Sequence, residues 1–175
     1  MHALELSSCA SATTMATSRV VPLDASVRAV IDQHKLWLPS TTFRPSGSTT
    51  EICSNDSEMQ TYGEGLVHEF RSQYWKVHLD MLLQRDADVQ QIDHNDQPIG
   101  ERKVLAFRFT SEADLLVDPG WSFDIIPVSG PILVNNALVN VGFYGHIDQA
   151  SRLKAVSPPR DAVRHCWLYM NRVDG

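Results

Sequence analysis

The residues and motifs that the sequence lacks exclude several classes of protein. Only three cysteines occur among its 175 residues, and Cys9, Cys53 and Cys166 are too far apart to form a metal-binding or redox pair. An odd, widely spaced set of thiols does not make a disulfide framework, so we expect an intracellular, reducing environment rather than secretion. The sequence has no run of 18 apolar residues, and its N-terminus lacks the basic start and apolar core of a secretory signal. No transmembrane segment is therefore predicted.

The common short motifs of catalysis and cofactor binding are also missing. The chain has no phosphate-binding loop, no dinucleotide fingerprint, and neither the GxSxG nor the HExxH pattern. The acidic stretch over residues 86–96 lacks the ligand spacing and the central glycine of a calcium loop. We therefore predict no cofactor.

Basic side chains are scarce in the middle of the chain. Residues 51–150 carry six basic and sixteen acidic side chains, which argues against a nucleic-acid groove and against sequence-specific binding of nucleic acid. Residues 151–175 reverse this balance, with five basic and two acidic side chains. The candidate binding patch that results consists of Arg152, Lys154, Arg160, Arg164 and Arg172. Scattered solvated charges are the simpler interpretation of the same residues.

The first third of the sequence is poor in strand signals. Residues 1–22 are mostly small and polar and predict a flexible tail. The segment "ASVRAVIDQHKLWL" follows Asp24, a good capping residue, and its apolar stripe predicts a helix over about 24–38. Pro39 should end that helix. Residues 39–60 are rich in Ser, Thr, Pro and Gly and predict a long surface loop.

A division of the chain follows from these patterns. We expect residues 1–61 to form a flexible N-terminal tail, one helix and a surface loop. Residues 62–175 should form a compact β-rich domain, because alternating apolar and polar residues dominate there.

Several segments of that domain predict strands. The expected strands cover residues 74–83, 103–109, 121–128, 132–147 and 162–173. Pro127 should push its strand to an edge, and Asn135-Asn136 can break the long fourth strand in two. The last strand is apolar on both faces and should be central. Residues 111–117 and 148–156 begin with capping residues and predict short helices. The predicted fold is α+β, with a mostly antiparallel sheet of about five to six strands, two or three short helices and a flexible N-terminal arm.

One polar row stands out within "VNVGFYGHID", residues 139–148. Its apolar row of Val139, Val141, Phe143, Gly145 and Ile147 should face the core, and Tyr144, His146 and Asp148 alternate with it. A similar row, His78 and Asp80, lies on the strand expected over residues 74–83. In an apolar cavity, Tyr144, His146, Asp148, His78 and Asp80 would be candidate catalytic residues for acid–base chemistry.

Two other interpretations of these rows remain. His78-x-Asp80 and His146-x-Asp148 have equal spacing and would offer four nitrogen and oxygen ligands if their strands were adjacent. The interpretation that we favour is a polar, solvent-facing side of a half-buried sheet, with no metal site. A cysteine nucleophile, Cys166 paired with His146 across strands, is a further alternative. A mid-strand cysteine flanked by apolar residues is more typical of a small buried side chain.

Two stretches resemble a known family. "ERKVLAFRFTSEADLL" (101–116) contains a strand ending in Leu-Ala-Phe before a polar turn. "VNVGFYGHIDQASRLKAV" (139–156) contains a Gly-hydrophobic-Tyr step followed by alternating residues. Both are similar to stretches of rhabdovirus matrix proteins of the plant-infecting type. The layout of a mobile N-terminal tail followed by a β-rich domain is similar as well.

The resemblance implies a non-enzymatic structural protein of the host cytoplasm and the virion. Such a protein self-associates, condenses the nucleocapsid and links it to the envelope. The tail or the surface loop would dock on a neighbouring copy, and the basic C-terminal patch would contact the nucleocapsid protein. Matrix proteins often begin with a lysine-rich tail that binds membrane, whereas the first lysine here is Lys35, so membrane contact by a basic tail is not expected.

We therefore take a self-associating structural protein, a homo-oligomer, as the leading hypothesis. A long polar tail and exposed strand edges favour it independently of the resemblance. The alternative is a small cavity enzyme of the cyclase, isomerase or lyase type that uses Tyr144, His146 and Asp148. A binding module without catalysis would use the same cavity.

Overall fold

The fold is built from two antiparallel β sheets. The computed structural model describes residues 19–53, 61–70, 73, 102–116, 121–147 and 152–172. The larger sheet has seven strands in the order β1 (Arg19–Pro22), β9 (Phe143–Ile147), β6 (Trp121–Pro127), β11 (Val163–Arg172), β4 (Arg102–Thr110), β3 (Thr50–Cys53) and β2 (Phe43–Pro45). The smaller sheet has four strands in the order β5 (Glu112–Leu116), β10 (Arg152–Val156), β7 (Ile132–Val134) and β8 (Ala137–Val139). The mostly antiparallel, β-rich character is confirmed, but the described residues form eleven strands rather than five or six.

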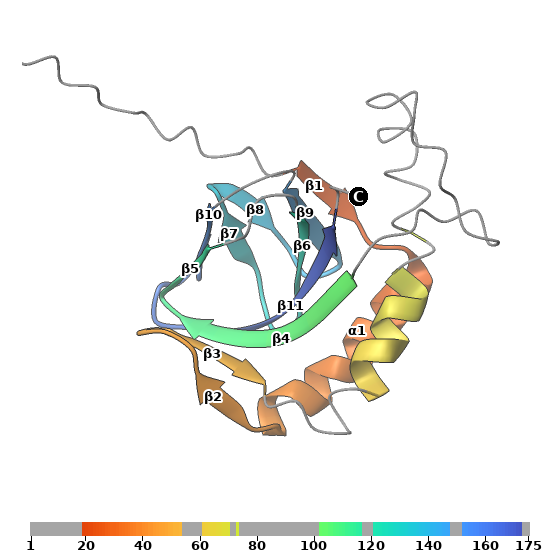
Figure 1. Ribbon diagram of the computed structural model, residues 1–175, viewed down its shortest axis with the longest axis horizontal. Coiled ribbons are helices and arrows are strands. Elements are labelled where there is room, and N and C mark those ends of the chain that lie inside the picture. Colours follow the sequence, from red (N-terminus) through yellow and green to blue (C-terminus); the bar gives the residue numbers. More distant parts are fainter. Residues whose placement is uncertain are drawn as a thin grey trace, which may run out of the picture.

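The two sheets face each other across a shared apolar core (Figure 1). Phe107, Phe109 and Ile125 come from the larger sheet, and Ile132 and Val134 come from the smaller one. All five are at most 1% exposed. Burial of these apolar side chains holds the two sheets together, because removing apolar surface from water stabilises the fold by about 25 cal/mol per Å².

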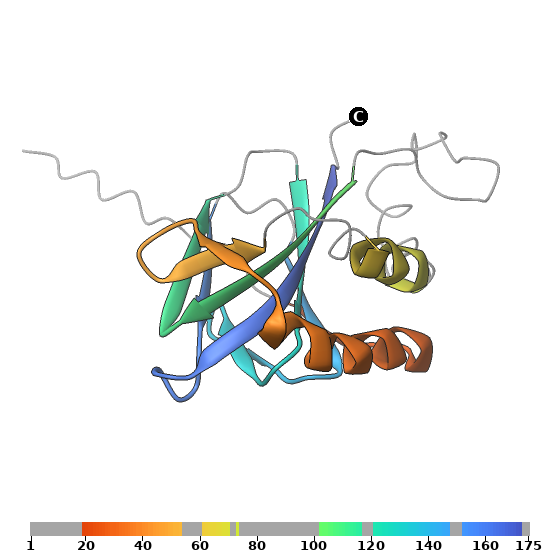
Figure 2. The same cartoon turned by 90° about the horizontal axis from the view of Figure 1, so that it is seen from below.

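Two helices cover the outer face of the larger sheet (Figures 1 and 2). The helix expected near residues 24–38 is confirmed as α1 (Ala25–Trp37), and a short 3₁₀ helix, η1 (Leu38–Ser40), follows it at Pro39. Asp24 occupies the N-cap position, although its side chain makes no capping hydrogen bond. A second helix spans residues 61–70. None of the helices in the described part of the chain is long and apolar enough to cross a membrane.

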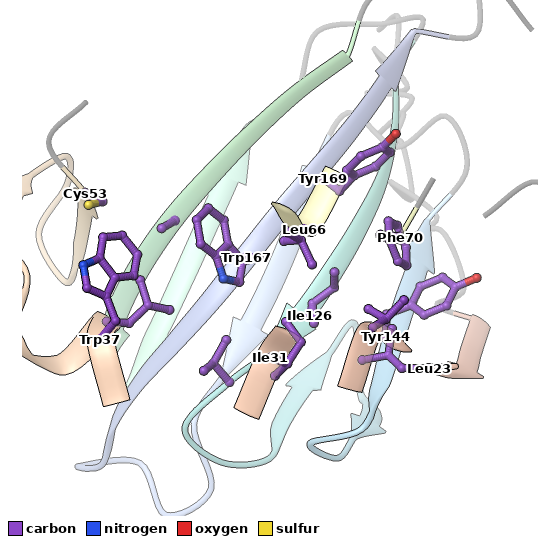
Figure 3. Packing of buried hydrophobic residues seen from close by; sticks show 14 of the residues in the cluster. Leu23, Ile31, Trp37, Cys53, Leu66, Phe70, Ile126, Tyr144, Trp167 and Tyr169 are labelled. Carbon is purple, nitrogen blue, oxygen red and sulfur yellow. The ribbon is translucent and has the colours of Figure 1, made fainter. Parts of the chain in front are cut away.

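A second apolar core lies between these helices and the sheet. Figure 3 shows Ile31 of α1 and Leu66 of the second helix near Ile126 and Trp167 of the sheet. The Trp167 indole N–H donates a hydrogen bond of 2.8 Å to Nδ1 of His34, which is 1% exposed. Burial lowers the pKa of His34 to about 4, so the ring stays neutral and can accept that bond.

Both segments that predicted short helices after β4 and β9 are strands instead. Glu112–Leu116 forms β5 and Arg152–Val156 forms β10, and the two pair with each other in antiparallel register. Ser111, with φ of 68°, makes the corner that carries the chain from β4 into β5. The residues with capping-box spacing at the start of β5 therefore form a corner rather than a helix start. Pairing between distant strands outweighs a weak local preference for helix.

The surface loop expected over residues 39–60 is in part a β hairpin. β2 pairs with β3, and β3 pairs with β4, so this hairpin extends the larger sheet. β1 also joins that sheet, through β9. Strands from both sides of the expected boundary near residue 62 thus pair within one sheet, which corrects the division of the chain into an arm and a domain.

Two further strand predictions need correction. β6 lies between β9 and β11 rather than at an edge, and Pro127 is tolerated because it is the last residue of its strand. The long strand expected over residues 132–147 is three strands. The predicted break at Asn135-Asn136 is confirmed, because both residues have positive φ in the turn between β7 and β8. The central position expected for the strand over residues 162–173 is confirmed for β11. The strand expected over residues 74–83 lies outside the described residues.

Candidate functional site

The polar row of β9 is buried rather than solvent-facing. Tyr144 is 0% exposed and His146 is 4% exposed, and both lie on the face of the larger sheet that the helices cover. In the row expected to face the core, Phe143 is 38% exposed, so that row is not a uniform core face. The prediction of a polar sheet surface is therefore wrong at Tyr144 and His146, because both faces of this strand are covered. Asp148, His78 and Asp80 lie outside the described residues.

His146 has a carboxylate partner that the sequence analysis did not identify. Asp124 of β6 lies opposite His146 of β9 in the antiparallel register. The Nδ1 atom of His146 is 2.7 Å from Oδ1 of Asp124, and the two side chains are 5% and 0% exposed. Every residue of β6 is buried, so an aspartate inside such a strand needs a polar partner. The single aspartate in this largely apolar segment was the signal in the sequence that could have indicated a buried polar pair.

The depth of this pair limits its chemistry. A substrate could reach Asp124 only by displacing the helices and side chains that cover the sheet. A buried imidazole–carboxylate pair fixes strand register well, because either group alone in the core would cost free energy. We therefore assign the pair a structural role between β6 and β9.

Cys166 does not form a dyad with His146. It lies opposite Pro127 of β6, and its fully buried side chain belongs to the core between the two sheets, on the other face from His146. Burial raises the pKa of this thiol well above its ordinary range, which disfavours the nucleophilic thiolate. Among the residues that the structure describes, no three histidine, cysteine or acidic side chains come close enough together to hold a metal ion.

The basic residues near the C-terminus have separate environments. The Lys154 ammonium is 3.1 Å from a Glu112 carboxylate oxygen. The Arg164 guanidinium donates hydrogen bonds to the carbonyl oxygens of Pro131 (3.0 Å) and Pro158 (2.6 Å). Both side chains are thus engaged within the chain. Arg160 is exposed in the turn before β11, and the side chains of Arg152 and Arg172 lie outside the described part.

A solvent-open recess lies between the tip of the β2–β3 hairpin and the corner where β4 turns into β5. Its volume is about 330 Å³. The floor consists of apolar side chains from β3, β4 and β11, namely Ile52, Leu105, Phe107 and Leu168. The rim consists of hairpin residues and of two acidic residues of β5, namely Ser46, Gly47, Ser48, Thr49, Thr50, Glu112 and Asp114.

The recess has a simple structural cause. The hairpin tip is anchored at both sides, because Thr110 N–H donates to the Thr49 carbonyl and the Thr49 hydroxyl donates to the Glu112 carbonyl. Across from the floor, β5 and β10 place the small side chains of Ala113 and Ala155 in the core. Neither alanine lines the recess, so its shape follows from the anchored hairpin tip.

Comparisons with known proteins do not identify this chain. No family model and no curated protein matches its sequence. Among solved structures, quercetin 2,3-dioxygenase from Acinetobacter baumannii has 9% identity and a TM-score of 0.37, with 42% of this chain and 26% of that chain covered. YhhW from Escherichia coli has 10% identity and a TM-score of 0.33, with coverage of 45% and 33%. GK1651 from Geobacillus kaustophilus has 10% identity and a TM-score of 0.38, with coverage of 78% and 45%.

The chain thus spans less than half the length of each of these three proteins. Their TM-scores are too low to support an assignment of fold or activity. None of these three proteins is a rhabdovirus matrix protein, so that resemblance stays a prediction.

Proposed function

We propose that this chain is a non-enzymatic binding protein and that the recess at the hairpin tip holds a small, uncharged, hydroxylated molecule with one apolar face. The observation that carries this proposal is a recess whose apolar floor is half-buried at Ile52 and Leu105, beneath a rim of hydroxyl and carboxylate groups. Small-molecule sites commonly combine an apolar lining with a few polar groups, in volumes of about 300–1,000 Å³. The recess lies at the lower end of that range, which suits a single sugar-like ring.

Charge favours an uncharged ligand. None of the described residues that line the recess is a lysine or an arginine, and two of them are acidic. Phosphates and carboxylates would therefore meet two carboxylates at the rim, and the nearby Lys154 ammonium is already paired with one of them. The Glu112 carboxylate already pairs with Lys154, which leaves it less able to attract a cation.

The lack of an imidazole or a thiol among the described residues of the recess favours binding over turnover. The imidazole–carboxylate pair described above is sealed under the helices, on the opposite face of the sheet from the recess. The residues that line the recess include no histidine and no cysteine. Ser and Thr hydroxyls orient a ligand through hydrogen bonds, and one of the two rim carboxylates, Glu112, is already paired with Lys154.

The test is ligand binding followed by ¹H–¹⁵N NMR, with methyl glucoside as the probe and glucose 6-phosphate as its charged counterpart. We expect the neutral sugar to shift the amide signals of residues 46–50, and the phosphate to bind at least about tenfold more weakly. Leu105→Phe should fill the recess and weaken binding by a similar factor. Leu36→Phe adds the same ring on an exposed site of α1 and serves as the control. Equal binding of both sugars, or of both variants, would contradict the proposal.

Self-association is a second candidate, and a separate observation favours it. Of the five large exposed hydrophobic side chains among the described residues, Val20, Leu138 and Phe143 lie on β1, β8 and β9. These three strands contact one another where the ends of the two sheets meet. Exposed apolar residues beside unpaired strand edges are typical of protein interfaces.

We propose that a second copy packs against this corner of the fold. Sedimentation velocity over a range of protein concentrations tests it directly. We expect concentration-dependent oligomers that Leu138→Lys weakens, whereas Leu36→Lys, at the most exposed of the five sites, leaves them unchanged. A monomer at every concentration would dismiss the idea. Condensation of a nucleocapsid stays a prediction of the family resemblance.

A further inference from the structure

A buried histidine lies beneath the β2–β3 hairpin. His165 of β11 is opposite Arg108 of β4, and Arg108 is opposite Glu51 of β3, so the three side chains share the helix-covered face of the sheet. His165 is 8% exposed, and among the described residues neither of its ring nitrogens has a hydrogen-bond partner. A buried polar group without a partner costs about 1–3 kcal/mol, so this ring has a reason to be present other than stability.

The hairpin is held to the sheet directly beside this ring. Arg108 donates from Nε to one Glu51 carboxylate oxygen at 2.6 Å and from Nη2 to the other at 3.1 Å. The Arg108 guanidinium also lies 4.7 Å from the centre of the Phe43 ring. Phe43 in turn meets the His165 ring in a T-shaped contact at 5.5 Å. The ion pair and Phe43 therefore clamp β2 and β3 onto β4 beside a neutral imidazole.

The charged groups that face His165 come from two strands only, among the residues described. β4 contributes Arg108 and β3 contributes Glu51, whereas β2 contributes the uncharged Phe43. On the other side, the segment after β6 is uncharged, and Ser129 accepts a hydrogen bond from the His165 backbone N–H. Burial lowers the pKa of His165, Arg108 lowers it further by charge repulsion, and Glu51 opposes both with a smaller effect.

We propose that His165 is a proton-operated latch for the β2–β3 hairpin. The neutral ring packs under Phe43 and beside the ion pair. A protonated ring would place a second cation next to Arg108 in a buried position and would draw water beneath the hairpin. The hairpin then separates from β4, and its strand pairing from Thr50 to Ile52 is lost.

The direction of the pH dependence follows from the lowered pKa. Because the closed form binds the proton less readily than the open form, closure is fully stable above the ordinary histidine value of 6.5 and weakens as the pH falls below it. One linked proton changes the opening equilibrium by at most about tenfold per pH unit. The hydrogen bonds from Arg108 lower the pKa of Glu51, which favours a charged carboxylate in the closed hairpin.

The latch would also regulate the recess, and this part rests on the proposed function. The hairpin tip supplies the hydroxyl rim and is anchored by Thr49 to Thr110 and Glu112. Separation of the hairpin removes one wall of the recess. Mild acid should therefore release a ligand that neutral pH retains.

Hydrogen exchange of the ligand-free protein tests the latch by itself. Amides of residues 43–53 are compared with those of β6 at about pH 5 and about pH 7.5, after correction for intrinsic exchange. We expect protection of the hairpin to fall by up to about tenfold per unit below pH 6.5, while β6 stays protected. His165→Phe should remove this dependence, and His68→Gln, at an exposed histidine, should keep it.

A second measurement keeps the proposal testable if His165→Phe folds poorly. NMR titration of the His165 ring in the unaltered protein should give a midpoint below 6.5. A midpoint at or above that value overturns the latch, and so does equal acid sensitivity of β6 and the hairpin. Because neither experiment uses a ligand, failure of sugar binding would contradict the proposed function and leave the latch intact.

Discussion

The two faces of the seven-stranded sheet differ in kind. Toward the smaller sheet, the buried side chains are mainly apolar, and Phe107, Phe109 and Ile125 are representative. Toward the helices, buried aromatic residues share the core with polar groups. Those polar groups include His34, Asp124, His146 and His165. One sheet therefore separates a core that depends on shape from a core that also depends on specific pairing.

The difference between the two cores shows where alternative packing arrangements are excluded. Apolar burial is non-directional, so a core of this kind tolerates rearrangement if volume is preserved. Each buried imidazole instead needs a hydrogen-bond partner at a defined position, and a single neighbouring residue either supplies it or does not. His34 accepts from Trp167 and His146 pairs with Asp124, whereas His165 has no partner among the described residues. Among the described residues, the helix-covered face thus holds both closely paired polar groups and polar groups without a hydrogen-bond partner, such as the His165 ring.

The largest expected loss of stability comes from the apolar face. Phe109→Ala removes a ring that is 1% exposed and stacked on Phe107, and should lower the free energy of unfolding by about 4 kcal/mol. Urea denaturation measures this change. Leu36→Ala, at a side chain 85% exposed, should change stability by less than about 0.5 kcal/mol and serves as the control. A loss of less than about 1 kcal/mol at Phe109 would mean that this face is not the main core.

Breaking the polar pair should cost nearly as much. Asp124→Ala leaves His146 buried without its carboxylate and should lower the free energy of unfolding by about 3 kcal/mol. Asp124→Asn keeps the shape and a hydrogen-bonding oxygen, so its loss should be clearly smaller. Chemical denaturation of both variants separates the two effects. Equal losses would indicate that packing, not the pairing of charge and hydrogen bond, stabilises β6 against β9.

His34 should make a smaller contribution that depends on pH. His34→Phe removes the acceptor for the Trp167 indole N–H and should cost about 1.5 kcal/mol at neutral pH. Because burial lowers the pKa of His34 to about 4, the unaltered protein should lose stability as the pH falls from 6.5 toward 4, and the variant should lose less. Thermal denaturation across that range gives the difference. Parallel curves for the two proteins would show that His34 does not titrate as expected.

The smallest expected effect is a gain in stability, at the corner where β4 turns into β5. Ser111 adopts a φ of 68°, which is unfavourable for residues other than glycine. Ser111→Gly should relieve this and raise the free energy of unfolding by up to about 1 kcal/mol. Thr110→Gly, one residue earlier in β4, should instead be destabilising, since glycine weakens a strand. A lower melting temperature for both variants would contradict the expectation.

Local patterns were sufficient for those elements whose signal is local. The apolar stripe of α1 and the alternation of β4 and β11 are visible over a few residues, and all three elements formed where expected. β5 and β10 were both predicted to be helical, and each is the other's strand partner. Nothing within either segment shows that pairing, because its benefit arises only when residues far apart in sequence meet.

The candidate site was predictable to a lesser degree. Tyr144 and His146 were singled out, but the partner of His146 is Asp124 on a strand that the sequence analysis treated as an edge. The recess was not predicted, because its floor and rim come from the hairpin, β4, β5 and β11 together. Its hairpin part lies in a segment rich in Ser, Thr, Pro and Gly, a composition that is usual in loops.

The pairing of early with late segments also determines when the protein can fold. Among the described strands β1 pairs with β9 alone, and His34 of α1 bonds to Trp167, which is 133 residues further along the chain. During synthesis, the first elements therefore cannot complete their contacts until β11 has been translated. Folding should then be slow, because distant contacts form late, and the exposed apolar stripe of α1 would be a natural target for chaperones in the interval.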